Sequence, residues 1–367
     1  MSSDKLRIAI LYGGRSAEHE VSLRSAASVF SALDKKKYRV TPVFITKNGA
    51  WFTRPEDLSS FGSKKHLSEK DRLILSPDPA HKGFLRSKGD NCFEHFPIDV
   101  VFPVLHGTFG EDGTLQGLLD LADIPYVGCG TLASAVGMDK IVMKAVFRDI
   151  GLNVGPFHWF YRSEWRQDPD RIVQELHGRP LPLFVKPANL GSSVGINKVS
   201  NFSDLEKAIE IAVSYDRKIL VEHGVAGREL EVSVLGNESA VASIPGEVVS
   251  HATFYNYEEK YFQNTAELII PAKLTEQETQ MAKKDALMAY RAVDGSGLAR
   301  VDMFLTPDNE IIVNEINTLP GFTSVSMYPK LWEASGLPYS QLIDKLISLA
   351  LDRHRDKTAI VTDRKTV

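Results

Sequence analysis

The segment "ARVDMFLTPDNEIIVNEIN" carries charged and amide side chains inside two apolar runs. The polar turn residues between the runs predict a β-hairpin. If its turn is centred between residues 308 and 309, Asp302 lies opposite Glu315 and Arg300 lies opposite Asn317, all on one face. Two carboxylates and an amide oxygen arranged in this way suit Mg²⁺, which usually keeps phosphate oxygens and water as well. An arginine–carboxylate cluster on a solvated sheet face explains the spacing equally well.

The segment "KPANLGSSVG" places Lys186 at the end of an apolar run and follows it with a loop of glycine and serine. Glycines let the backbone approach phosphate groups, and exposed N–H groups, hydroxyls and a lysine can bind them. The pattern is not that of a P-loop. An ordinary Gly–Ser turn therefore stands as the alternative.

Further polar side chains stand at the ends of expected elements. Glu222 ends an apolar strand and can accept a hydrogen bond from an amino group such as that of adenine, although a surface carboxylate is equally compatible. Glu18 precedes a helix, where it either binds a ligand or complements the helix dipole. His106 lies in the glycine-rich "LHGTFGEDG", and such loops bind small ligands or simply turn corners.

The polar stretch "ATFYNYEEKYFQNTAE" contains Lys260 and Tyr261 and has neither strand nor helix periodicity. Its aromatic residues favour a loop that packs over another part of the site or molecule when closed. An ordinary surface excursion is the alternative.

Alternating apolar runs and helical patterns indicate an α/β fold. Residues 6–46 have the strand–helix–strand pattern of a parallel sheet, and later strands end in glycine, which predicts a ligand crevice at their carboxyl ends. We also expect a short strand at "IPYVGCG" and a surface excursion at residues 50–95. A closing helix is expected at about 340–351, followed by a frayed tail.

The chain has 367 residues, more than one hydrophobic core usually supports, so two or three domains are expected. A formal net charge of −4 gives no basic surface for nucleic acid or an anionic membrane, and no apolar run is long enough to cross a bilayer. The two cysteines, Cys92 and Cys129, lack metal-ligand spacing and favour a reducing compartment. We therefore expect a cytoplasmic enzyme, with a cytoplasmic binding module as the alternative.

The chain closely resembles the D-alanine–D-alanine ligases, members of the ATP-grasp superfamily, in eight motifs: "GGRSAE", "HGTFGEDGTLQG", "MDK", "KPANLGSSVG", "VEHGVAGRE", "YEEKY", "RVD" and "NEINTLPGFTSVS". The similarity runs from about Ile8 to Leu349. It implies a three-domain ATP-grasp fold of the α/β class. The implied parts are an N-terminal parallel α/β substrate-binding domain at 1–136, a central subdomain at 137–229 and a C-terminal catalytic domain at 230–367.

The resemblance also implies a reaction. The family uses ATP to join two D-alanines into the dipeptide needed for peptidoglycan. The first D-alanine is phosphorylated on its carboxylate, the amine of the second attacks the acyl phosphate, and the tetrahedral intermediate expels phosphate. Two Mg²⁺ ions, for which Mn²⁺ can substitute, and a homodimer are implied as well.

The matched positions imply roles for single residues. Asp302, Glu315 and Asn317 resemble the metal ligands of the family. Arg300 and the backbone N–H of Gly321 resemble the groups that stabilise the oxyanion of the tetrahedral intermediate. The implied nucleotide contacts are Lys140, Lys186, Ser193, Glu222, Glu229, Lys260 and Asn314.

The remaining matches concern the amino-acid substrates. Glu18 matches the acid that holds the ammonium group of the first D-alanine, and His106 is expected beside that substrate. Ser326 matches the serine that contacts the carboxylate of the second D-alanine. It precedes Met327, where many relatives carry leucine, a change that conserves volume.

Tyr261 matches a tyrosine of the mobile loop, where it would hydrogen-bond to Ser192, which in turn reaches Glu18 and closes the site. A tyrosine at this position favours D-alanine over D-lactate as the second substrate. Two rivals remain: another ATP-grasp ligase with different substrates, and a nucleotide-binding regulatory protein without turnover. "RSAEHEVS" and "YEEKY" argue against the first because they match substrate contacts, and the convergence of Arg300 on the metal ligands argues against the second.

Overall fold

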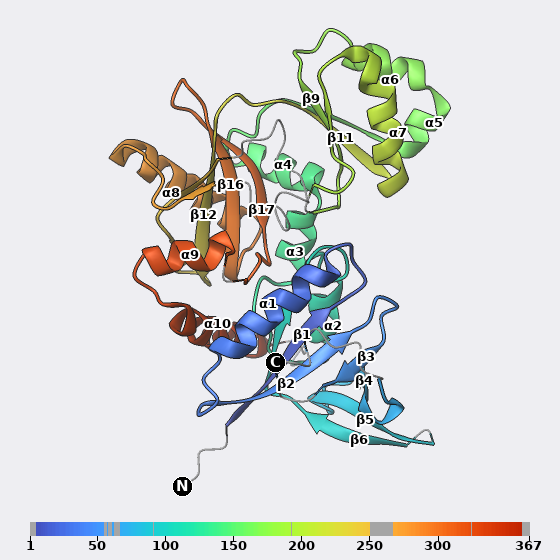
Figure 1. The fold of residues 1–367 in the computed structure, drawn as a ribbon, viewed down its shortest axis with the longest axis vertical. Coiled ribbons are helices and arrows are strands. Elements are labelled where there is room, and N and C mark those ends of the chain that lie inside the picture. The colour runs from blue at the N-terminus through green and yellow to red at the C-terminus, as the bar shows by residue number, and fades with distance from the viewer. Residues whose placement is uncertain are drawn as a thin grey trace, which may run out of the picture.

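The computed structural model of the chain describes residues 5–54, 57, 61, 67–90, 92–191, 193–249, 267–323 and 325–361. In these parts of the chain the strands form three sheets, each with its own helices (Figure 1). Parallel pairing occurs in the first sheet, whereas the other two are antiparallel throughout. The expected α/β class is confirmed.

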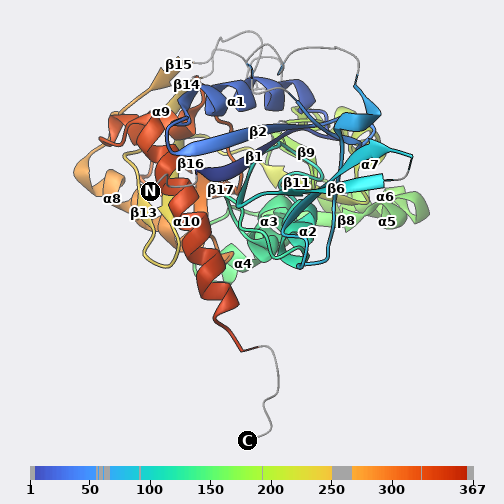
Figure 2. The same ribbon diagram turned by 90° about the horizontal axis from the view of Figure 1, so that it is seen from below.

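The first sheet has the strand order β6-β5-β4-β3-β2-β1-β7. β1 pairs in parallel with β2, as predicted, and also with β7. Alternate residues of β1 enter different cores: Ile8 and Ile10 pack with the helix α1, whereas Ala9 and Leu11 pack with α2. Figure 2 shows these helices on opposite sides of the sheet. The elements are β1 (Leu6–Gly13), α1 (His19–Ala32), β2 (Tyr38–Ile45), β3 (Trp51–Thr53), β4 (Arg72–Leu75), β5 (Gly83–Gly89), β6 (Cys92–Pro97), β7 (Val100–Val104) and α2 (Thr114–Leu121).

Most of the expected surface excursion at residues 50–95 is regular structure, so this prediction is wrong. Strands β3 to β6 extend the sheet in antiparallel order beyond β2. The strands are short and only one face is covered, so few apolar residues are needed. Leu73 and Leu75 of β4 alternate with exposed residues, and Phe84 of β5 is fully buried against Trp51, with ring centroids 6.0 Å apart.

The second sheet has the order β10-β9-β11-β8 and carries its helices on one side (Figure 1). Its core joins Phe160, Val185 and Ile219 of the strands to Ile172 and Ile209 of the helices. β9 and β10 flank the loop at 188–196, as predicted. The elements are β8 (Phe157–Tyr161), α5 (Arg162–Gln167), α6 (Pro169–Leu176), β9 (Leu183–Pro187), β10 (Asn197–Val199), α7 (Leu205–Tyr215) and β11 (Lys218–His223).

The third sheet has the order β15-β14-β12-β16-β17, and β13 pairs with β12. Helix α8 packs closely against this sheet because several of its buried side chains are small: Ala282, Ala286 and Ala289. The elements are β12 (Arg228–Gly236), β13 (Val241–Ala242), β14 (Gly246–Val249), β15 (Glu267–Ile269), α8 (Glu276–Ala292), β16 (Gly297–Leu305), β17 (Ile311–Asn317) and α9 (Met327–Ala334). Two helices, α3 (Thr131–Met138) and α4 (Lys140–Asp149), lead from the first sheet to the second.

The last helix, α10 (Tyr339–Thr358), continues through much of the expected frayed tail, so that prediction is wrong up to Thr358. Its C-terminal half is held by a hydrogen bond between His354 and the carboxylate of Asp123, at 2.9 Å, and by an ion pair between Lys357 and Asp120, at 2.8 Å. The expected strand at "IPYVGCG" is reduced to a single bridge between Val101 and Tyr126. Among the described helices, none is long and apolar enough to span a membrane.

Candidate active site

The hairpin of β16 and β17 places its four polar residues in the predicted register. Asp302 pairs with Glu315, and Arg300 pairs with Asn317. The predicted turn centre is wrong, because Leu305 pairs with Ile311 and the turn is therefore centred on residue 308. One extra residue in β17, at position 314, shifts the register and restores the pairing.

Arg300 lies in a buried cluster rather than on a solvated face. Its guanidinium donates two hydrogen bonds of 2.6 Å to the carboxylate of Asp302 and lies 2.9 Å from Glu231 of the neighbouring strand β12. Arg300 and Asp302 are 5% and 4% exposed, so the alternative of a surface cluster fails. Two carboxylates hold the guanidinium in one orientation, as a fixed cation requires. Glu231, which the sequence analysis missed, pairs directly with Asp302 across the sheet.

Asp302, Glu315 and Asn317 are suited to bind a hard cation. Where the structure describes the chain, no three His, Cys, Asp or Glu side chains form a metal-binding group, so this set relies on two carboxylates and an amide. Such a set leaves several coordination positions of Mg²⁺ for phosphate oxygens and water, which is the usual arrangement for this ion. Asp302 binds Arg300 through both oxygens, and each oxygen keeps a further lone pair. The donors present fit the ion.

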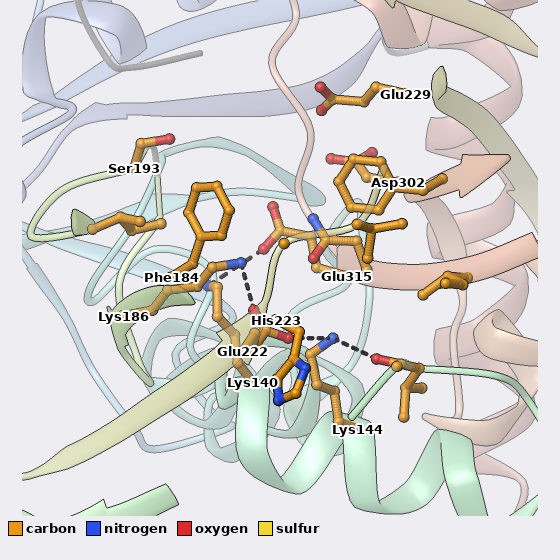
Figure 3. Close-up of a pocket in the computed structure, with 18 of the residues that line it drawn as sticks. Lys140, Lys144, Phe184, Lys186, Ser193, Glu222, His223, Glu229, Asp302 and Glu315 are labelled. Carbon is orange, nitrogen blue, oxygen red and sulfur yellow. Dashed lines mark hydrogen bonds and ion pairs between the residues drawn. The ribbon is translucent and has the colours of Figure 1, made fainter. Parts of the chain in front are cut away.

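A cavity between the second and third sheets contains most of the predicted nucleotide contacts. We call it the lysine cavity; its lining includes Lys140, Lys144, Phe184, Lys186, Ser193, Glu222, His223, Glu229, Asp302, Asn314 and Glu315 (Figure 3). Of the predicted nucleotide contacts, only Lys260 lies outside the described residues. The structure thus brings together side chains that are 175 positions apart in the sequence (140 to 315).

Glu222 is the most strongly paired carboxylate of the lysine cavity. Its two oxygens lie 2.7 Å from Lys144 Nζ and 2.5 Å from Lys186 Nζ. Burial alone would raise the pKa of Glu222, but the two lysines together lower it to about 2. Burial alone would lower the pKa of Lys186, but Glu222, with Glu315 and Glu229, raises it. Glu222 is 8% exposed, so the alternative of a surface carboxylate fails.

Lys140 connects the lysine cavity to a second cavity. Its ammonium donates a hydrogen bond of 2.8 Å to the carbonyl of Leu190 and lies 3.4 Å from Glu315. Asp139 begins α4 and accepts hydrogen bonds from the N–H groups of Ile141 and Val142 at 3.2 Å. The motif "MDK" therefore supplies both the helix cap and the lysine.

The second cavity, which we call the acid cavity, lies where the first and third sheets meet. Its lining includes Glu18, His106, Glu111, Lys140, Arg300, Glu315, Asn317 and Gly321. Glu18 stands at the start of α1 but makes no side-chain cap there, so it is not used as a helix cap. His106 Nε2 lies 3.2 Å from Ser25 Oγ. Glu18 and His106, both predicted to lie beside the first D-alanine, line the same cavity.

Glu111 is an acid-cavity residue to which the sequence analysis gave no role. It is buried and accepts a hydrogen bond of 2.9 Å from the N–H of Gly107. Burial and the neighbouring charge of Glu18 raise its pKa to about 8. The sequence feature that could have identified Glu111 as a site residue is its position in the glycine-rich segment "HGTFGEDG", which also contains His106.

The remaining predicted residues fall into three groups. Ser326 immediately precedes α9. Its Oγ lies 2.7 Å from Thr323 Oγ1 and close to Gly321, where an added Cβ would come within 3.0 Å of it. Met327 is buried in a small apolar cluster with Val248 and Leu331. Ser192 and Tyr261, like Lys260, lie outside the described residues.

Family models match both halves of the chain. The model described as "D-ala D-ala ligase N-terminus" matches residues 7–129, and "D-ala D-ala ligase C-terminus" matches residues 146–348. The D-alanine–D-alanine ligase of Natranaerobius thermophilus is 48% identical over 361 residues and covers 98% of each chain. That of Solibacter usitatus is 49% identical over 354 residues, which cover 96% of this chain and 98% of the relative.

Solved structures give the same result. The D-alanine–D-alanine ligase from Coxiella burnetii superimposes with a TM-score of 0.82 at 38% identity and covers 97% of each chain. The VanG D-Ala:D-Ser ligase from Enterococcus faecalis superimposes with a TM-score of 0.84 at 37% identity, covering 95% of this chain and 100% of that one. The two differ in the second amino acid that their names give.

Proposed function

This chain belongs to the D-alanine–D-alanine ligase family, and from that premise we propose how its residues divide the work of the reaction. It is an ATP-dependent ligase that forms D-alanyl-D-alanine for cell-wall synthesis. The observation that supports the assignment best is the buried hairpin of β16 and β17. Glu315 of that hairpin lines both the lysine cavity and the acid cavity, so a phosphoryl group and a carboxylate could meet beside it.

ATP would bind in the lysine cavity. Lys140, Lys186 and Lys260 would contact its phosphates together with Ser193 of the glycine–serine loop, since these groups supply positive charge and N–H or hydroxyl donors. Glu222 would accept a hydrogen bond from the amino group of adenine, and Glu229 would contact the ribose. Asn314, displaced from the strand by the bulge, would contact the nucleotide beside Glu315.

Asp302, Glu315 and Asn317 would hold Mg²⁺, as two ions, with Mn²⁺ as a substitute. The metal would supply positive charge that neutralises the phosphate oxygens during transfer. Arg300 already has its orientation fixed by Asp302 and Glu231. It can therefore stabilise developing negative charge on the tetrahedral carbon's oxygen without reorganising, with the N–H of Gly321 as a second donor.

The amino acids would bind in the acid cavity. Glu18 would pair with the ammonium of the first D-alanine, beside His106, and Ser326 would bind the carboxylate of the second, next to the buried Met327. We further propose that Tyr261 and Ser192 close the site, which would exclude water from the acyl phosphate. A cytoplasmic location and a homodimer are part of the proposal.

Phosphate release from ATP tests the function directly. We expect release that depends on D-alanine and on Mg²⁺, with formation of the dipeptide, and none with L-alanine. Arms with D-alanine plus D-serine or D-lactate define the second substrate, since one structural neighbour is a D-Ala:D-Ser ligase. No D-alanine-dependent release would refute the assignment, and a preference for D-serine would reassign the second substrate.

A further inference from the structure

Lys144 is a lysine that the reaction as described does not use. It lies on α4 one turn after Lys140, and its side chain is 2% exposed. Its ammonium lies 2.7 Å from Glu222 and donates to the carbonyl of Val154, at 3.4 Å. Burial lowers its pKa, partly opposed by the attraction of Glu222. Buried lysines are rare unless they are paired, and Lys144 has such a partner in Glu222.

Glu222 has one lysine on each oxygen, and the two lysines differ in their access to the cavity. Figure 3 shows Lys144 and Lys186 reaching the Glu222 carboxylate from different sides, Lys144 from the helix α4. The side chain of Lys186 is 14% exposed and that of Lys144 is 2% exposed. Lys186 comes from β9, whereas the contact of Lys144 with Val154 ties it to the segment before β8. Lys186 can therefore turn towards a ligand, while Lys144 cannot.

Because Glu222 is paired with two lysines, it keeps a counter-ion when one of them moves to bind a nucleotide. In the structure Lys186 pairs with Glu222, yet the proposed function requires it to bind phosphate. If Glu222 had no other partner, the departure of Lys186 would leave a buried carboxylate without a counter-ion, which is strongly unfavourable. A second, immobile lysine removes this obstacle.

We propose that Lys144 is a positioning residue: it is the permanent counter-ion of Glu222, which frees Lys186 to bind the phosphates of ATP and keeps Glu222 directed at the amino group of adenine. This inference rests on the proposed roles of Glu222 and Lys186. It assigns to Lys144 no contact with the nucleotide. Its effect is on ATP affinity, through Glu222, and not on the chemical step.

The test uses the full-length enzyme and the variant Lys144→Met, which keeps the length of the side chain and removes its charge. We expect the KM for ATP to rise about tenfold or more, because a hydrogen-bonded charge is lost, while kcat at saturating ATP changes less than about twofold. The KM for D-alanine should stay unchanged. Lys207→Met, at an exposed position of α7, is the matched control and should leave every constant unchanged.

A double-mutant cycle with Glu222→Gln separates this role from a purely structural one. Glutamine needs no counter-ion, so adding Lys144→Met to Glu222→Gln should change the KM for ATP less than about twofold. Lost packing would weaken both backgrounds equally. If Lys144→Met alone fails to fold, Lys144→Gln and ADP binding measured by calorimetry give the same comparison.

Three results are decisive. A tenfold or greater loss in the parent that disappears in the Glu222→Gln background supports the proposal. An unchanged KM for ATP in Lys144→Met overturns it, as does an equal loss in both backgrounds. These failures differ from a failure of the proposed function, in which the unmodified enzyme itself would show no D-alanine-dependent phosphate release.

Discussion

The pKa of Glu111 lies well above the ordinary value of a carboxyl group. Its pKa is raised from 4.5 to about 8, first by burial and then by Glu18. An acid with a raised pKa binds a proton in the folded chain between these two values, whereas the unfolded chain has already released it. Folding stability therefore falls as the pH rises through this window.

The variant Glu111→Gln should remove this loss, because glutamine is neutral throughout and can still accept the N–H of Gly107. We expect the free energy of unfolding of the variant, minus that of the parent, to be larger (more stabilising) at pH 8.5 than at pH 5.5 by on the order of 1 kcal/mol or more. Urea unfolding at the two pH values measures the difference. The exposed Glu238→Gln is the control, and a difference independent of pH would contradict the prediction.

Glu315 lines both the lysine cavity and the acid cavity. Glu315→Gln keeps the shape and one oxygen acceptor but removes the charge that would hold the metal and that faces Lys140 at 3.4 Å. We expect turnover to be abolished and the thermal unfolding midpoint to change little, because the side chain is only partly buried. Phosphate-release kinetics beside a thermal melt check both parts. A fully active Glu315→Gln enzyme would show that this carboxylate is not a metal ligand.

Among single residues, those site residues could be predicted from the sequence whose positions follow from the local periodicity of a strand or helix. Asp302 and Glu315 were found because a hairpin with a period of two places them opposite each other, although the turn is centred one half-residue earlier and an extra residue at position 314 restores the pairing. Glu231 was missed because it reaches the cluster from a strand about 70 residues earlier (302 − 231 = 71), and no local pattern predicts that strands β12 and β16 are neighbours. Lys144 did leave a signal, since it follows Lys140 by four residues on one helix face.

The C-terminal part of helix α10 is ordered by contacts with distant residues, which its own sequence does not predict. Arg353 donates to the carbonyl of Tyr126 at 2.9 Å and to Ser296 Oγ at 2.8 Å, also bonds to the carbonyl of Gly128, and lies 4.3 Å from the centre of the Tyr126 ring. The tail "DRHRDKT" is polar and was predicted to fray. Its order comes from distant partners, as does the order of strands β3 to β6.

Arg353→Met should therefore destabilise the protein by about 2–3 kcal/mol, because hydrogen bonds to a charged group are lost and three acceptors are left without it. Arg355→Met on the same helix is the matched control: its side chain is 77% exposed and its ion pair is with Asp352, three residues away. That variant should stay within about 0.5 kcal/mol of the parent. Chemical denaturation measures both. Equal stabilities would mean that α10 does not depend on this contact.

The hydrophobic cores of the molecule differ in how much of the chain contributes to them. One core lies entirely within residues 160–221, between β8–β11 and α5–α7. Another joins β1, β7 and α1 to α9 and α10, so that both ends of the described chain share it; Phe102 of β7 lies edge-on to Phe322, with centroids 6.0 Å apart. We propose that the boundaries near residues 136 and 229 mark units that open separately, with α10 held to the first unit by the shared core.

Hydrogen exchange in two cavity-forming variants tests this proposal. Phe160→Ala, at a side chain that is 1% exposed, removes packing worth about 3–5 kcal/mol from the central core. We expect faster exchange in residues 157–223 and unchanged protection in β1 and β16, because local opening follows cooperative units. Phe102→Ala should instead speed exchange in both β1 and α10, which are more than 300 positions apart in the sequence (339 − 13 = 326). Loss of protection throughout the chain in Phe160→Ala would show that the central sheet is not a separate unit.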